Sequence, residues 1–421
     1  MSESGGLAEP VAETNAERRL RVALYSGIVV PRDAVSRSLI HKLDALRTVI
    51  GLGAPIDVTV FTQSIDEAEP EFQVMESVSE LLHADEFWSA DVHVFEEGMY
   101  YDLFNSVFVI PPDRPIMAIE HNSTPVDLID VPWAKAAVER SHAQRFNLTL
   151  ARHVACDSEF NVEMARSVGV PDERISVLHL PPTVIPAREP GPMSDHEGPV
   201  QLLFLGRFVR GKGIADMLEL TRRLLAGDPE RFSVTIAGDP RFSDHDLMED
   251  MAELAAAHPG RVEVALAPDD AAMAELFERS DALVIPSYHE GYCVPVVEAY
   301  GFGRFVIAYD AGNLPYIVAG LGAVVPTGDL DALGAAVLRF ADAIEASRSG
   351  EELRLPAERG PMSEREWADA VRSHLSDYSP ANFERRFLAL LTELAAVSPA
   401  GRIPEVDRVL GARIGVLSGA G

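Results

Sequence analysis

Short apolar segments alternate with longer amphipathic ones along this chain, and the alternation occurs twice. In the first half the apolar segments are Arg21–Tyr25, Asp57–Thr62, Asp91–Phe95, Pro115–Glu120, His153–Asp157 and Ile175–His179. In the second half they are Gln201–Leu205, Ser233–Ala237, Arg261–Ala265, Ala282–Ile285, Phe305–Ala308 and Gly322–Val325. Short apolar runs of this kind predict strands that are buried on both faces of a parallel sheet, and alternation with helices is typical of βα units. We therefore predict an α/β protein with two domains.

The predicted helices and the composition between the halves set the domain limits. The helices of the first half and of the C-terminal part are predicted at Ala34–Ile50, Tyr100–Val107, Trp133–Leu150, Ser158–Val168, Asp331–Ala346, Glu364–Ser376 and Pro380–Ala396. Pro181 to Pro199 is rich in proline, glycine and charge and lacks periodicity, which is typical of a linker. We assign residues 20–185 to a first domain, 186–199 to the linker and 200–375 to a second domain. Residues 397–421 show no convincing pattern.

Length, charge and cysteine content narrow the class of protein. A chain of 421 residues exceeds the size at which one core usually stops growing. The net charge of −30 repels nucleic acid and anionic membranes, so any anionic ligand needs a local basic pocket. Two cysteines, no basic and apolar leader in the first 19 residues and no apolar run of spanning length lead us to expect a cytoplasmic protein without stable membrane insertion. A local patch of Lys135, Arg140, Arg145 and Arg152 remains a candidate contact for a lipid headgroup.

Two carboxylates with seven residues between them carry the most specific chemistry. Glu290 follows the apolar strand Ala282–Ile285 by a few residues, and Glu298 lies after Pro295, a residue favoured at the first turn of a helix. We therefore predict a helix that starts at Pro295 and carries Glu298 in its first turn. Ligands of open α/β sheets bind beyond the carboxyl ends of strands, where free N–H groups of a helix start can bind oxygens. The alternative is a solvated Glu290 and a Glu298 that only complements the helix dipole.

A basic, glycine-rich turn opens the second half. Gly206 and Arg207 follow strand Gln201–Leu205, and Lys212 precedes a predicted helix that begins at Ile214. A cation at a helix start opposes the helix dipole, which favours an anion nearby. Arg207 and Lys212 can clamp a diphosphate with charge-assisted hydrogen bonds, or they are simply two solvated bases.

A third polar cluster ends the strand Pro115–Glu120. His121, Asn122 and Thr124 follow this strand directly, and His121 can donate a hydrogen bond to a sugar hydroxyl or a phosphate. The alternative for His121 is a cap on the following loop. Asp244-His245-Asp246 has the spacing of a metal-binding acidic pair, but it lies in a polar stretch remote from the other motifs, and we expect it to be solvated.

The combination of Gly206-Arg207 with Lys212-Gly213, of Glu290-Gly291-Tyr292 with Glu298, and of His121-Asn122 with Thr124-Pro125 resembles the retaining GT-B glycosyltransferases of the glycosyl transferases group 1 type. Their order and spacing match from about Arg21 to Ala396. The resemblance implies a GT-B fold, in which two Rossmann-like domains face each other across a cleft. It further implies that the first domain holds the acceptor, that the second binds the nucleotide sugar, and that helix 380–396 returns to the first domain.

The resemblance also implies roles for single residues. Arg207 and Lys212 would neutralise the diphosphate, Glu290 would contact the hydroxyls of the transferred sugar, and Glu298 would hold the ribose. Backbone amides of Gly291, Tyr292, Cys293 and Val294 would add contacts, together with Gly206 and Asn122, and His121 would lie near the sugar. The first-strand loop Tyr25–Pro31 would approach the donor phosphate through Gly27, but it departs from the family because Gly27 is its single glycine where relatives usually have two. Tyr316 departs too, because it stands where relatives usually have a glutamate.

The sequence thus predicts a retaining glycosyltransferase that needs no metal or other cofactor and moves a hexose or amino-hexose from a nucleoside diphosphate, with UDP as the expected nucleotide, to an acceptor hydroxyl. The motifs leave the acceptor and the oligomeric state open. Two alternatives remain: a sugar-nucleotide epimerase or a phosphorylase of the same fold, and a catalytically silent protein that binds a nucleotide sugar or a partner protein. A nicotinamide dehydrogenase is disfavoured because no Gly-x-Gly-x-x-Gly follows the first strand of either half.

Overall fold

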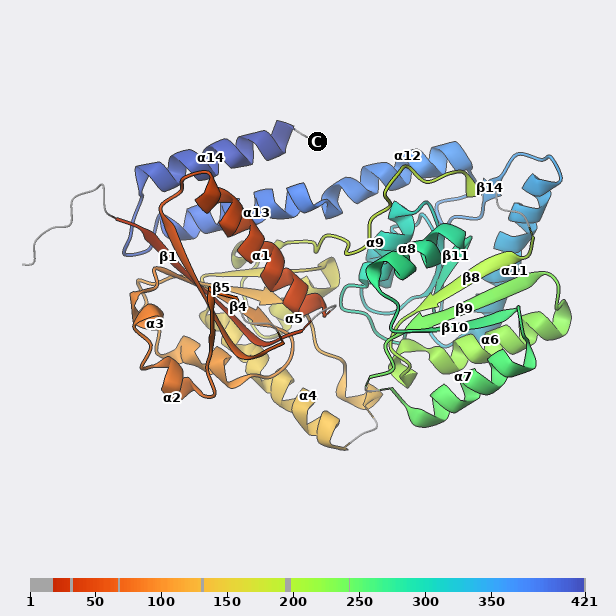
Figure 1. The fold of residues 1–421 in the computed structure, drawn as a ribbon, viewed down its shortest axis with the longest axis horizontal. Helices are drawn as coiled ribbons and strands as arrows, with labels where there is room; N and C mark the ends of the chain where they lie inside the picture. The colour runs from red at the N-terminus through yellow and green to blue at the C-terminus, as the bar shows by residue number, and fades with distance from the viewer. Residues whose placement is uncertain are drawn as a thin grey trace, which may run out of the picture.

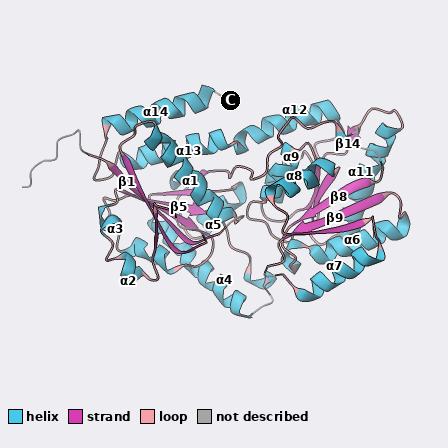
Figure 2. Ribbon diagram, in the orientation of Figure 1, coloured by secondary structure: helices cyan, strands magenta, loops and turns pink. Residues whose placement is uncertain are grey.

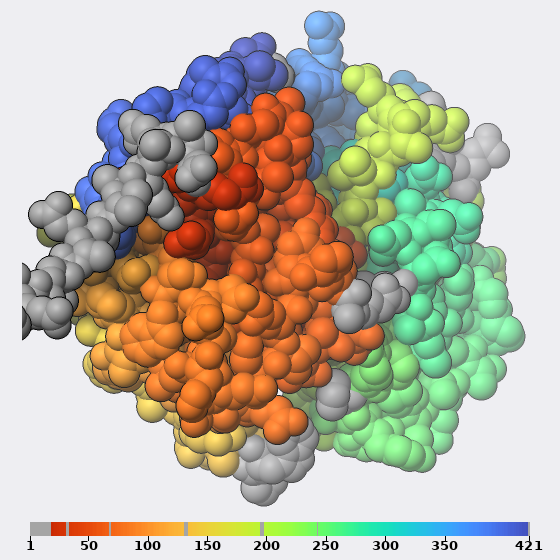
Figure 3. Space-filling model, turned by 60° about the vertical axis from the view of Figure 1, so that its left-hand side comes forward, coloured from red at the N-terminus to blue at the C-terminus, as the bar shows by residue number. Residues whose placement is uncertain are grey.

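The computed structural model describes residues 18–30, 33–66, 69–129, 132–193, 198–241 and 243–419. Two parallel sheets, each with helices packed on both faces, form two domains that lie side by side (Figure 1, Figure 2). The space-filling view shows the first domain, in red to orange, against the second, in green (Figure 3). The predicted fold class is therefore confirmed.

The first sheet has seven strands in the order β3-β2-β1-β4-β5-β6-β7. They are β1 Leu20–Val29, β2 Ile56–Ile65, β3 Phe72–Val74, β4 Val92–Glu97, β5 Ile116–Glu120, β6 His153–Cys156 and β7 Ile175–Val177. The helices of this domain are α1 Ala34–Gly51, α2 Val78–Leu81, α3 Asp85–Ser89, α4 Pro132–Gln144 and α5 Glu159–Ser167, with the 3₁₀ helices η1 Asp102–Phe108, η2 Val126–Leu128, η3 Arg145–Leu150 and η4 Asp172–Arg174.

The second sheet has six strands in the order β10-β9-β8-β11-β12-β13. They are β8 Val200–Leu205, β9 Phe232–Gly238, β10 Val262–Leu266, β11 Ala282–Ile285, β12 Phe305–Tyr309 and β13 Ala323–Val325. The helical segments are η6 Arg210–Lys212, α6 Ile214–Gly227, α7 His245–Ala257, α8 Asp270–Arg279, α9 Val294–Gly301, α10 Leu314–Val318, α11 Leu330–Arg348, α12 Glu364–Leu375 and η7 Ser376–Tyr378. A two-stranded antiparallel pair, β14 Arg354–Leu355 and β15 Met362–Ser363, follows α11.

Strand order reverses once in each sheet. The chain leaves β1 toward β2 and returns to place β4 on the other side of β1, and β8 and β11 repeat this arrangement in the second sheet. Loops diverge at such a point, which leaves a crevice beyond the carboxyl ends of the two central strands. In the second domain, the loops that follow β8 and β11 carry the basic turn and Glu290. The fold thus brings two of the three sequence motifs to one edge of one sheet.

The linker and the last helices connect the domains. Most of residues 178–199 lacks regular structure, but Leu178, Leu180, Val184 and Met193 are buried, so much of this segment packs as part of the molecule. Linker residues 194–197 lie outside the described residues. Helix α13, Pro380–Ala395, leaves the second domain and packs on α1 and β4 of the first (Figure 1).

Several predicted elements differ from the structure. The helix predicted at Tyr100–Val107 is the 3₁₀ helix Asp102–Phe108, and Trp133–Leu150 divides into α4 and η3. In the last residues, where the sequence showed no pattern, Pro404–Gly419 forms the helix α14, which packs on α13 and α1. Its apolar residues Val406, Val409 and Leu410 are buried. Among the described residues no helix is both long and apolar enough to cross a membrane.

The packing of α14 predicts a measurable contribution to stability. Leu410 is fully buried, so Leu410→Ala should lower the free energy of unfolding by about 2–5 kcal/mol through lost burial and the cavity left behind. Val416, on the same helix, is 65% exposed, and Val416→Ala should change this free energy by less than about 0.5 kcal/mol. Urea unfolding followed by circular dichroism measures both. Equal stability of the two variants would show that α14 does not contribute to the core.

Candidate active site

Lys212 and Glu290 form an ion pair between the loops that follow β8 and β11. The Nζ atom of Lys212 lies 2.8 Å from each carboxylate oxygen of Glu290. The hydroxyl of Ser287 donates to Oε1 of Glu290 at 2.8 Å. Glu290 is buried, whereas the Lys212 side chain is 26% exposed, so the pair lies just below the protein surface. Ser287 was not predicted, although its place directly beyond the strand that precedes Glu290 is a usable signal.

Backbone contacts that only glycine permits hold these two loops together and pack the loop after β12 against Glu290. Gly213 has a φ of +69°, and a Cβ atom there would lie 1.8 Å from the carbonyl oxygen of Pro286. A Cβ atom on Gly312 would lie 2.2 Å from the carbonyl oxygen of Glu290. The N–H of Tyr288 donates to the Gly211 carbonyl at 3.0 Å. Because L side chains cannot occupy such positions, the glycines fix the distance between Lys212 and Glu290.

Arg207 lies in the same loop as Lys212 but, unlike Lys212, it is not paired with a described carboxylate. It is exposed, and its side chain makes no ion pair or hydrogen bond with a described residue. Gly206, before it, donates its N–H to the Ala237 carbonyl at 3.1 Å, and a Cβ atom on Gly238 would lie 1.9 Å from the Gly206 oxygen. The turn is therefore anchored on β9, while the guanidinium of Arg207 extends into solvent.

Glu298 holds the segment between the domains. Helix α9 begins at Val294, one residue before the predicted start, so Glu298 lies just beyond the first turn rather than in it. Its Oε1 accepts the N–H groups of Thr183 and Val184 at 3.1 and 3.0 Å. Burial raises the pKa of Glu298 to about 7, although these two hydrogen bonds favour the ionised form. Its predicted contact with a ribose stays a prediction.

His121 lies within a buried charged network at the carboxyl ends of β4, β5 and β6. Its Nε2 is 2.7 Å from Oε2 of Glu96, and its Nδ1 is 3.1 Å from Oδ2 of Asp157. The ammonium of Lys42, which is fully buried, lies 2.9 Å from the other oxygen of Glu96. Burial lowers the pKa of His121, but hydrogen bonds to Asp157 and Glu96 and their charges raise it to about 9. His121 is therefore an imidazolium at neutral pH, with a carboxylate at each ring nitrogen.

The domains meet at Gly291. The hydroxyl of Ser158 donates to the Gly291 carbonyl at 2.6 Å, and the Asn122 amide oxygen lies 3.3 Å from Nε2 of His289. A Cβ atom on Gly291 would lie 2.7 Å from Cβ of Asn122. Asn122 itself has a φ of +67°. This contact brings the third motif of the sequence against the Glu290 loop.

The residues after Gly291 are buried at the start of α9. The Tyr292 hydroxyl donates to the Leu180 carbonyl, and the Tyr292 carbonyl accepts from the Asn313 amide at 2.9 Å. Cys293 is buried and has a φ of +77°, in the left-handed region. Two non-glycine residues with positive φ, Asn122 and Cys293, thus flank the contact between the domains, and such conformations occur often at ligand sites.

Other residues that the sequence analysis singled out include Gly27, Pro31 and Arg145. Gly27 is in strand β1, not in a loop, and a Cβ atom there would lie 2.8 Å from Cβ of Tyr101. Pro31 of the predicted loop lies outside the described residues. Arg145 of the predicted basic patch is buried and donates to Ser123, so it does not form part of a surface patch.

The acidic pair Asp244 and Asp246, at the start of α7, contacts an exposed arginine. Asp246 pairs with the exposed Arg210 at 2.9 Å, and Asp244 accepts the Arg210 N–H at 3.3 Å. No group of three or more His, Cys, Asp or Glu side chains that could hold a metal occurs in the part of the chain that the structure describes.

The fold and this site define a class of protein. Among solved structures, a sucrose-phosphate synthase from Thermosynechococcus elongatus superposes with a TM-score of 0.65 at 18% identity, over 90% of this chain and all of that one. An Anabaena protein solved in complex with UDP-glucose superposes with a TM-score of 0.61 at 14% identity, over 89% of this chain and all of that one. The architecture is that of GT-B glycosyltransferases.

Sequence comparison finds a family match in the second half of the chain. Residues 192–349 match the family described as Glycosyl transferases group 1. The GDP-mannose:cellobiosyl-diphosphopolyprenol alpha-mannosyltransferase of Xanthomonas campestris is 26% identical over 43% of this chain and 47% of its own length. The chain thus spans about half the length of this curated relative.

The network around His121 predicts a pH dependence of stability. Its folded pKa of about 9 exceeds the unfolded value of about 6.5, so the stabilisation is fully present below pH 6.5 and is lost as pH rises through 9. The difference of about 2.5 units corresponds to about 3 kcal/mol. The free energy of unfolding of the wild type should exceed that of His121→Gln by about 3 kcal/mol at about pH 6. At about pH 9.5 the difference should be much smaller. Urea unfolding at both pH values measures it, and a difference that does not change with pH would contradict a charged His121.

Proposed function

We propose that this protein is a retaining glycosyltransferase that moves a hexose or amino-hexose from a nucleoside diphosphate sugar, with UDP as the nucleotide, to an acceptor hydroxyl. The observation that carries the proposal is the Lys212–Glu290 pair at the strand reversal of the second domain, with Arg207 beside it and His121 and Asn122 opposite. A cation pair and a carboxylate at one sheet edge match a ligand that has a diphosphate and a polyhydroxyl group. The match to the group 1 family and the solved complex of a structural relative with UDP-glucose support it.

Each group has a role in the proposed reaction. Arg207, exposed and without a described partner, binds the diphosphate in fork geometry. Lys212 turns from Glu290 to the diphosphate when the donor enters, and this releases the Glu290 carboxylate to accept hydrogen bonds from sugar hydroxyls. Glu298 exchanges its contact with residues 183 and 184 for the ribose, or shares its carboxylate between them.

The bond changes follow from this placement. The acceptor oxygen attacks the anomeric carbon on the face from which the diphosphate leaves, the bond from that carbon to the diphosphate breaks, and a diphosphate oxygen takes the acceptor's proton. Two cations stabilise the charge that develops on the leaving group, which is the part Mg²⁺ plays in other transferases. We therefore propose that no metal is required. The imidazole of His121 lies on the first-domain side, where Glu96 and Asp157 engage both of its ring nitrogens.

A donor panel tests the binding half of the proposal. UDP, GDP, ADP and dTDP sugars are compared without metal by thermal unfolding and calorimetry. One nucleotide sugar, expected to be a UDP sugar, should stabilise the protein selectively, and Glu298→Ala should lose this effect because its carboxylate is the group that we assign to the ribose. Stabilisation by none of them would contradict the assignment of the motifs and favour a partner-binding protein.

Two substitutions test the catalytic half. Glu290→Ala should lower transfer by about a hundredfold or more while nucleotide binding persists, because its carboxylate acts on the sugar rather than on the diphosphate. Lys212→Ala should weaken both. Glu249→Ala, an exposed residue of α7, is the matched control and should change neither. Turnover near the wild-type value in Glu290→Ala would remove the role that we give to this residue.

A further inference from the structure

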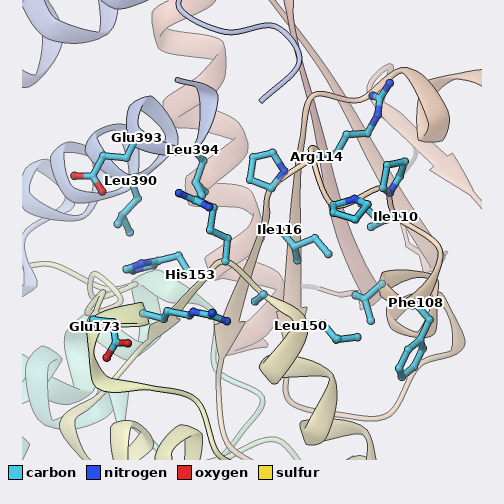
Figure 4. Close-up of a pocket in the computed structure, with 17 residues that line it drawn as sticks. Phe108, Ile110, Arg114, Ile116, Leu150, His153, Glu173, Leu390, Glu393 and Leu394 are labelled. Atoms are coloured by element: carbon cyan, nitrogen blue, oxygen red, sulfur yellow. The ribbon is translucent and has the colours of Figure 1, made fainter. Parts of the chain in front are cut away.

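A pocket of about 700 Å³ opens in the first domain, away from the candidate active site (Figure 4). It lies at the amino ends of β5 and β6, where Ile116 and His153 line it, and α13 forms another wall. Strand β5 runs from Ile116 at the pocket to Glu120, next to His121. The two sites are therefore separated by the length of β5, roughly 13 Å at about 3.3 Å per residue. A ligand in this pocket would not be a substrate of the reaction proposed above.

The pocket has both polar and apolar walls. Helix α13 contributes Leu390 and Leu394, and Leu150 and Ile110 contribute from the other side (Figure 4). Phe108 at the same side is 67% exposed and extends this apolar surface. A volume of this size is typical of a small-molecule site.

Two arginines line the pocket without acidic partners. Arg152 and Arg174 are exposed, and neither guanidinium forms an ion pair or a hydrogen bond with a described residue. Glu173 and Glu393 line the same pocket, yet neither carboxylate is paired with these arginines. In a chain with a net charge of −30, carboxylates are the commonest charged groups, yet they leave both of these guanidiniums unpaired.

The other basic groups of the pocket are already engaged or neutral. The guanidinium of Arg114 donates to the carbonyl of Ala90. His153 is hydrogen-bonded through Nε2 to the Ser176 hydroxyl at 2.8 Å, and burial lowers the pKa of its imidazole. The capacity to bind an anion therefore rests on Arg152 and Arg174.

We propose that this pocket binds a single amphipathic anion, a phosphate monoester with an alkyl or aryl group. The phosphate lies against Arg152 and Arg174, whose planar donors match phosphate oxygens, and the apolar group packs on Leu150, Leu390 and Leu394. The ligand enters as one molecule rather than as part of a bilayer, because the site is concave, two carboxylates line it, and the strongly negative chain repels an anionic membrane. Bound there, the ligand bridges α13 to the first sheet.

Calorimetric titration with octyl phosphate, below the concentration at which it forms micelles, tests the proposal on the full chain. We expect one binding site. Arg152→Ala and Arg174→Ala should each weaken binding by about tenfold or more, because each removes charge-assisted hydrogen bonds. Glu393→Gln should tighten binding, because it removes a negative charge from the pocket. Arg372→Ala, an exposed arginine of α12 in the second domain, is the control and should bind like the wild type.

Three outcomes would overturn the proposal. Inorganic phosphate that binds as tightly as octyl phosphate would show that the apolar walls do not take part. Binding to phosphatidylglycerol vesicles but not to monomeric octyl phosphate would show a membrane contact instead of a ligand pocket. Absence of binding by a wild-type protein that unfolds cooperatively on heating would show that the arginines are solvated surface groups. None of these results depends on the donor or acceptor of the proposed transfer reaction.

Discussion

The close approach of the loops after β8 and β11 is the constraint on which the candidate site depends. Gly213 packs against the carbonyl of Pro286, and Gly312 packs against that of Glu290, at distances that exclude a side chain. This packing sets Lys212 against Glu290, and it is possible because the strand order reverses between β8 and β11. A cation and a carboxylate thus share a crevice at the edge of a parallel sheet, where a ligand can separate them.

Basic groups gather at the candidate site of this acidic protein. Lys212 and Arg207 supply the second-domain side, and the imidazolium of His121 lies on the first-domain side. Next to His121, a buried cation pairs with one of the carboxylates at the strand ends. Burial and the nearby Glu120 raise the pKa of Glu97 well above its usual range, and Lys42 pairs with Glu96. The carboxylates at these strand ends therefore have a buried cation beside them as well as His121.

Much of the fold and part of the site could be predicted from the sequence, because they are encoded locally. Strand Ala282–Ile285 was predicted with the bounds that the structure shows, and helix α6 begins at the predicted residue Ile214, since short apolar runs and a glycine turn mark them. Partners distant in sequence could not be predicted. Lys42 and Glu96 are 54 residues apart, and no local pattern links them or shows that both nitrogens of His121 are engaged. Glu298 was assigned from its spacing, but its contact with residues 183 and 184 depends on how the segment between the domains folds back.

The proposed reaction breaks the bond between a nucleotide and a sugar with retention of configuration. Proton NMR of a UDP-α-hexose incubated with the protein and no acceptor tests this most directly, because water then takes the acceptor's place. We expect slow release of UDP together with hexose that appears first as the α anomer, and loss of this release in Glu290→Ala. First appearance of the β anomer would contradict retention, and an intact nucleotide sugar with an inverted ring carbon would identify an epimerase instead.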